Sequence, residues 1–100
     1  MNQIHHWIAG TELKGASGRT GDVYDPATGQ ISGKVDFANN AEVDHAVSVA
    51  KTAFAEWSTT SITKRTQIMF AFRHLLNERK SEIAALITSE HGKVLSDALG

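Results

Sequence analysis

The chain has 100 residues, enough for one domain at most, and its 41% hydrophobic and 21% charged residues are typical of a folded globular chain. Its formal net charge of −1 provides no electrostatic basis for binding nucleic acid or an anionic membrane. No apolar run approaches the roughly 20 residues that span a bilayer, and the first ten residues lack the regions of a signal peptide. Without cysteine, these residues contain no disulfide, thiolate metal site or cysteine nucleophile, which is consistent with a cytoplasmic location.

The first third of the chain, residues 1–38, predicts antiparallel hairpins. An apolar run over residues 4–9 closes at a glycine and favours a strand, which residues 11–13 continue after a tight turn. Further strands are expected around residues 22–24 and 31–37, on either side of a turn with Pro26 and Gly29. The last of these strands is expected to bury one face, because apolar residues and glycine alternate with polar ones. The alternating sets are Ile31, Gly33, Val35 and Phe37 against Ser32, Lys34 and Asp36.

Helices are predicted for the rest of the chain. Asn39 and Glu42 have the spacing of a capping box, so a helix is expected over residues 39–57. The helical period of apolar residues then predicts helices over 62–79 and 81–91, with Ser81 as a possible cap for the second. Gly92 is expected to end that helix in the left-handed conformation, and a further helix starts within 95–100. Met69 and the aromatic residues are expected in the core.

Two clusters could carry chemistry, and each also has a structural interpretation. His5 and His6 could begin a metal site, but no further ligand lies at a recognisable spacing, so structural or surface roles are favoured. Residues 90–93 combine an acid, a base and a cation. Without a nucleophile nearby, His91 and Lys93 are better explained as complements to a helix end. The chain contains no βαβ unit and no glycine-rich phosphate loop, and it stops inside a helical pattern, so we expect a fragment of a longer protein.

Several stretches taken together resemble the amino-terminal portion of the aldehyde dehydrogenase superfamily. They are Trp7–Gly10, Asp25–Gly29 with Val35, Glu42–Val47 leading to Ala53, Phe54 and Trp57, then Arg65, Arg73–Leu76 and Glu90–Lys93. The resemblance covers nearly the whole chain in the family's order. Residues 17–29 and 87–98 are most similar to the CoA-acylating methylmalonate-semialdehyde dehydrogenase branch.

The resemblance implies an α/β parent fold with a Rossmann-type cofactor domain, of which this α+β segment would be the incomplete amino-terminal part. Family members oxidise an aldehyde with NAD through a cysteine nucleophile and a thioester. In the acylating branch CoA takes the acyl group, so methylmalonate or malonate semialdehyde would yield propionyl-CoA or acetyl-CoA. The parent would bind its aldehyde and CoA through the missing remainder and form a homodimer or homotetramer. No catalytic or NAD-binding residue is expected within these 100 residues.

One site within the chain is implied by the resemblance. In several relatives a structural monovalent cation is held by backbone carbonyls before the Asp-Pro turn and by an acidic side chain, which here correspond to Val23, Tyr24 and Glu90. Two alternatives remain open for the function. The parent could be another NAD(P)-dependent semialdehyde dehydrogenase that hydrolyses its thioester, such as succinate-semialdehyde dehydrogenase. The chain could also be a non-catalytic fragment that acts only by association.

Overall fold

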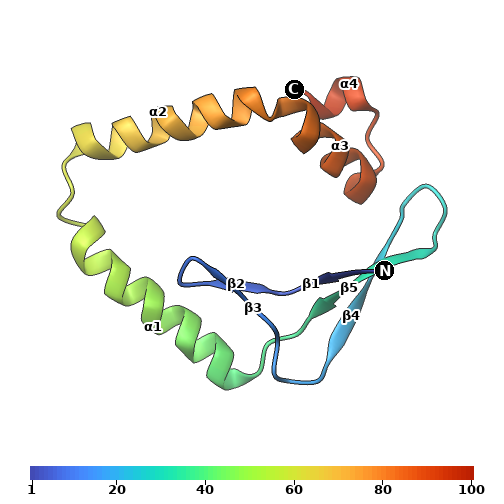
Figure 1. The fold of residues 1–100 in the computed structure, drawn as a ribbon, viewed down its shortest axis with the longest axis horizontal. Helices are drawn as coiled ribbons and strands as arrows, with labels where there is room; N and C mark the ends of the chain where they lie inside the picture. The colour runs from blue at the N-terminus through green and yellow to red at the C-terminus, as the bar shows by residue number, and fades with distance from the viewer. The chain divides into compact units, whose positions relative to one another are not determined.

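The computed structural model describes all 100 residues, which divide into two compact units (Figure 1). The first unit contains residues 1–24 and 31–59, and the second contains residues 25–30 and 60–100. The elements are strands followed by helices, as expected for an α+β segment. Each unit is described separately below.

A three-stranded sheet forms the centre of the first unit. It contains β1 (Asn2–Ile4), β4 (Thr20–Tyr24) and β5 (Ile31–Asp36) in the order β1-β5-β4. The pairing of β4 with β5 is antiparallel, as the hairpin prediction requires, whereas β1 runs parallel to β5 (Figure 1). The parallel pair was not predicted, because its two strands are distant in sequence and no local pattern connects them.

A separate hairpin is formed by β2 (His6–Ile8) and β3 (Thr11–Leu13). Its two turn residues, Ala9 and Gly10, both have positive φ, at 56° and 76°. This is the type I′ geometry that matches the twist of a two-residue hairpin. The strand predicted over residues 4–9 is therefore divided, because the chain leaves β1 at His5 and enters β2.

Helix α1 (Asn40–Trp57) completes the first unit, and its start confirms the capping box. The Glu42 N–H donates to Asn39 Oδ1 at 2.9 Å, and the Asn39 N–H donates to Glu42 Oε2 at 2.8 Å. Each residue thus satisfies a backbone donor that the helix cannot pair within itself.

The second unit contains α2 (Ile62–Glu78), α3 (Lys80–His91) and α4 (Leu95–Ala98). Ser61 caps α2 by accepting the Lys64 N–H, as expected for the interruption between the first two helices. The predicted cap at Ser81 is wrong, because α3 already begins at Lys80 and only Arg79 separates it from α2. Arg79 serves as the end of one helix and the start of the next, and its guanidinium bonds Glu82 at 2.6 and 2.9 Å.

Gly92 ends α3 with φ 82°, and its N–H donates to the Thr88 carbonyl, which confirms the predicted left-handed terminator. The turn over residues 25–30 belongs to the same unit. The Gly29 N–H donates to the Asp25 carbonyl at 2.7 Å, and the Ala27 N–H donates to the Asp25 side chain at 2.8 Å. Pro26 of this turn lies against Gly92, since a Cβ placed on Gly92 would be 3.3 Å from Pro26 Cγ.

The apolar core within the chain is very small. Ala84 is its only buried hydrophobic side chain, at 1% exposure. The expectation that Met69 and the aromatic residues are core is wrong for this segment, since Met69 is 56% and Phe70 62% exposed. The large apolar side chains of α1 and α2 are exposed. No helix combines the length and apolar character needed to cross a membrane.

Candidate functional site

The most extensive polar cluster of the chain surrounds Asp36, at the end of β5. Its side chain accepts hydrogen bonds from the Gly15 N–H at 2.7 Å and from Gln3 Nε2 at 2.5 Å, and His5 Nδ1 lies 2.7 Å from Oδ2. Asp36 is buried at 9% exposure, although it belongs to the polar set of the alternating pattern. A Cβ at Gly15 would lie 2.7 Å from Asp36 Cβ, so only glycine fits at that position.

These contacts set the charge state of Asp36. The Gly15 N–H lowers its pKa most, followed by the hydrogen bond with His5, and the pKa falls from 3.8 to about 2. The carboxylate is therefore ionised at neutral pH and is a poor proton donor there. Since its oxygens already accept three hydrogen bonds, we interpret Asp36 as a structural group.

A second carboxylate, that of Glu42, binds Ala16, the residue that follows Gly15 in the loop between β3 and β4. Glu42 Oε1 accepts the Ala16 N–H at 2.7 Å, while its other oxygen takes part in the capping box. The backbone N–H groups of Asn39 and Ala16, in that order, lower the pKa of Glu42. His6 Nε2 lies 3.8 Å from Glu42 Oε1. Two consecutive loop amides thus bind two carboxylates, and each of these carboxylates has one of the paired histidines beside it.

The favoured structural role of the histidine pair agrees with this geometry, because His5 bonds Asp36 and His6 faces Glu42. No group of three or more His, Cys, Asp and Glu side chains in the chain is placed to hold a metal ion. A hollow of about 400 Å³ adjoins the Asp36 cluster. Its lining is Gln3, His5, Lys14, Gly15, Gly18, Arg19, Thr20 and Asp36.

The tetrad at residues 90–93 lies at a helix end, as the structural interpretation proposed. Glu90 and His91 occupy the last turn of α3, and Gly92 terminates it. All four residues are exposed. A cationic His91 in this turn complements the negative end of the helix dipole.

The residues expected to bind a cation occupy both units. Val23 and Tyr24 end β4 in the first unit, and Glu90 belongs to α3 in the second. Ser32 Oγ donates to the Val23 carbonyl at 3.2 Å, and Val23 is also paired with Gly33 in the sheet. Carbonyl and carboxylate oxygens are suitable ligands for a hard cation. The cation site stays a prediction that rests on the resemblance.

The start of α1, the long helix that directly follows the strands, is poorly suited to bind a phosphate of NAD. At the start of α1, the backbone N–H of Asn39 already donates to the Glu42 carboxylate, and the N–H of Glu42 donates to Asn39. Glu42 also places a negative charge where a phosphate would bind a helix N-terminus. This helix start is therefore a poor phosphate site, and the absence of NAD-binding residues from the chain stays a prediction.

Sequence reasoning missed the Asp36 cluster. Its partners lie 21 to 33 residues away along the chain, so no local spacing connects them. A polar residue that ends an apolar strand beside a glycine-rich loop is the only available signal, and it is weak.

Comparison with known proteins gives a consistent family assignment. Residues 13–100 match the family described as the aldehyde dehydrogenase family. Malonate-semialdehyde dehydrogenase of Pseudomonas aeruginosa is 39% identical over 100 residues, which are the whole of this chain and 20% of that protein. The chain thus spans about a fifth of the length of the curated relatives it matches.

Solved structures agree with the sequence match. Methylmalonate-semialdehyde dehydrogenase from Oceanimonas doudoroffii superposes with a TM-score of 0.93 at 40% identity, covering all of this chain and 20% of that one. A variant of aldehyde dehydrogenase C from Pseudomonas syringae, solved with NAD+ and octanal, gives a TM-score of 0.90 at 35% identity, over 97% of this chain and 20% of that one.

Proposed function

Because the chain belongs to the aldehyde dehydrogenase family, we propose that it is the amino-terminal segment of an NAD-dependent, CoA-acylating semialdehyde dehydrogenase. The substrates would be malonate or methylmalonate semialdehyde, and the products acetyl-CoA or propionyl-CoA. The observation that carries the proposal is the match along the whole chain, at 36–39% identity, to proteins named malonate-semialdehyde dehydrogenase. The 40% identical structure with the related methylmalonate name supports it.

The 100 residues would contribute to the structure of this enzyme and not to the chemical steps of its reaction. The chain has no cysteine, so the nucleophile would lie in the rest of the parent protein. The loop held by Asp36 and Glu42 is the most strongly bonded polar feature of the segment. In the parent, NAD supplies the hydride acceptor, and CoA would receive the acyl group in place of water.

The test is NADH formation by the full-length protein with malonate semialdehyde, measured with and without CoA. We expect turnover that depends on CoA and an acyl-CoA product identified by mass spectrometry. Replacement of the parent's cysteine nucleophile by alanine is the control and should abolish NADH formation. NADH formation at the same rate without CoA would instead support the alternative enzyme that hydrolyses its thioester. A parent that forms no NADH with any semialdehyde would favour the non-catalytic alternative.

Three further properties belong to the proposal. A cytoplasmic location is consistent with the absence of cysteine from the chain. Assembly of the parent into a homodimer or homotetramer would provide cover for exposed apolar surface. The structural cation at Val23, Tyr24 and Glu90 would be checked by comparing the thermal stability of the parent in sodium, potassium and a bulky organic cation.

A further inference from the structure

Two basic side chains line the hollow beside Asp36 without an ionic partner. Lys14 and Arg19 lie near the two ends of the loop between β3 and β4, and both line this hollow of about 400 Å³. Both are exposed, and neither takes part in the ion pairs of the chain. Two unpaired cations at one hollow, in a chain whose formal net charge is −1, point to an anion as its ligand.

The loop that carries these cations is fixed by hydrogen bonds before any ligand binds. The Gly15 N–H donates to Asp36 Oδ2 at 2.7 Å. The Arg19 N–H donates to Ser17 Oγ at 3.1 Å, and its guanidinium donates to the Ala38 carbonyl at 3.1 Å. This last bond uses one of the five N–H groups of the guanidinium and leaves four for a ligand. A loop that is already ordered loses little entropy when it binds.

The acidic residue of the lining does not oppose an anion strongly. The Asp36 side chain is only 7% exposed, and its oxygens accept hydrogen bonds from Gln3 and Gly15, with His5 Nδ1 at 2.7 Å. These donors offset its negative charge. A phosphate group has a charge of about −1.5 to −2 at neutral pH and three acceptor oxygens, so it suits two cations, whereas a carboxylate is satisfied by one guanidinium.

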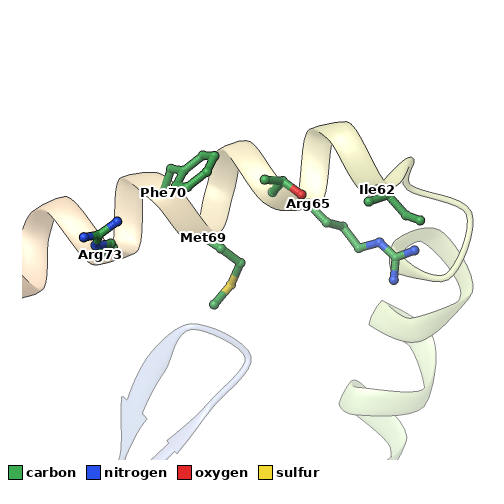
Figure 2. Close-up of a pocket in the computed structure, with 6 residues that line it drawn as sticks. Ile62, Arg65, Met69, Phe70 and Arg73 are labelled. Atoms are coloured by element: carbon green, nitrogen blue, oxygen red, sulfur yellow. The ribbon is translucent and has the colours of Figure 1, made fainter.

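A second hollow with two cations, on α2, is less suited to an anion. Arg65 and Arg73 line this hollow of about 590 Å³, and Figure 2 shows their guanidinium groups at opposite ends of it, with Met69 and Phe70 between them. An anion placed between these arginines would therefore contact apolar side chains. In the hollow beside Asp36, by contrast, every lining residue other than glycine is polar or charged.

We propose that the hollow beside Asp36 binds the phosphate group of a small ligand. The Lys14 ammonium and the Arg19 guanidinium supply the charge, and the Thr20 hydroxyl at the same hollow supplies a further donor. Side chains make these contacts because the two consecutive loop N–H groups already bind Asp36 and Glu42. Free phosphate and the 3′-phosphate of CoA both carry this group, and only the second source rests on the proposed function.

Calorimetric titration of the full-length protein with inorganic phosphate, at constant ionic strength in chloride, tests the hollow. We expect saturable binding that Lys14→Met and Arg19→Met each weaken by roughly tenfold or more, because each removes a charged hydrogen bond. Arg19→Lys keeps the charge without the planar fork and should fall between. Melting temperatures without phosphate establish that each variant is folded.

Lys34→Met is the matched control. It removes the same charge from the same unit, but Lys34 Nζ is paired with Asp22 at 2.8 Å and does not line the hollow, so this variant should bind phosphate as the wild type does. No saturable phosphate binding by the wild type would overturn the proposal, whatever the source of the phosphate group. Binding that Lys14→Met and Arg19→Met leave unchanged would place the phosphate elsewhere and overturn it as well.

Titration with CoA and with dephospho-CoA distinguishes the two sources. If CoA is the ligand, it binds the wild type more tightly than dephospho-CoA does, and Lys14→Met removes this difference. If the two bind alike while inorganic phosphate binds at the hollow, free phosphate is the ligand. NADH formation is measured in the same preparations. A protein that binds phosphate through Lys14 and Arg19 but forms no NADH would overturn the proposed function and support this inference.

Discussion

Replacing Gly92 with alanine should destabilise the parent protein through two separable effects. Gly92 ends α3 at φ 82°, a conformation that costs an L-residue about 1–2 kcal/mol. The added Cβ would also lie 3.3 Å from Pro26 Cγ, closer than ordinary van der Waals contact. Alanine restores about 0.4–1 kcal/mol by restricting the unfolded chain. With a further cost of about 1 kcal/mol for displacing the turn, the expected net loss is about 2 kcal/mol.

Gly29→Ala is the matched control for this prediction. Gly29 has φ 71°, close to that of Gly92, but nothing lies within 4 Å of a Cβ there. The backbone cost and the unfolded-state gain therefore cancel between the two variants, and their difference measures the contact with Pro26. The assay is urea unfolding at fixed protein concentration, because association shifts apparent stability. Equal midpoints for the two variants would refute the Pro26 contact, and a Gly92→Ala variant as stable as the wild type would refute the left-handed terminator.

Two other predictions concern the first unit. Folding lowers the pKa of Asp36 from 3.8 to about 2, so the ionised carboxylate stabilises the fold above pH 4 and this stabilisation is lost as the pH falls toward 2. Asp36→Asn should therefore flatten the profile of melting temperature against pH between pH 4 and pH 2. Profiles of the variant and the wild type that run parallel there would contradict the reasoning. Asn39→Ala removes the acceptor for the Glu42 N–H and should cost about 1 kcal/mol in thermal unfolding, whereas Asn39→Asp should be nearly neutral. Equal losses for the two Asn39 variants would show that the cap contributes nothing.

The features that the sequence predicted correctly are those encoded within a few residues. The capping box needs only Asn39 and Glu42, three positions apart, and the helix end needs only Gly92 after an apolar period. The break after α2 was expected near Lys80, but its form was not, because Ser81 provides a plausible cap while Arg79 carries no cap signal. Helix and strand boundaries therefore follow from local chemistry to within a residue or two.

Burial was predicted less well, because it depends on groups distant in sequence or outside the chain. Asp36 was grouped with the polar side of its strand, yet Gln3, His5 and Gly15 enclose it. Met69 is the opposite case, because its periodic position predicts burial and it is 56% exposed. A periodic pattern records how much apolar surface must be covered, and it does not identify the covering element.

The single-residue junction at Arg79 has a consequence for how the second unit can be enclosed. The chain changes direction between α2 and α3 (Figure 1), yet the Arg79 N–H donates to the Leu75 carbonyl and the Ile83 N–H donates to the Arg79 carbonyl, both at 3.0 Å. Most corners between helices leave backbone groups that only water satisfies, which keeps those corners at the surface. Here both main-chain groups of the junction residue are paired within the chain. Arg79 could therefore be enclosed at the bend without its backbone losing a hydrogen bond to water.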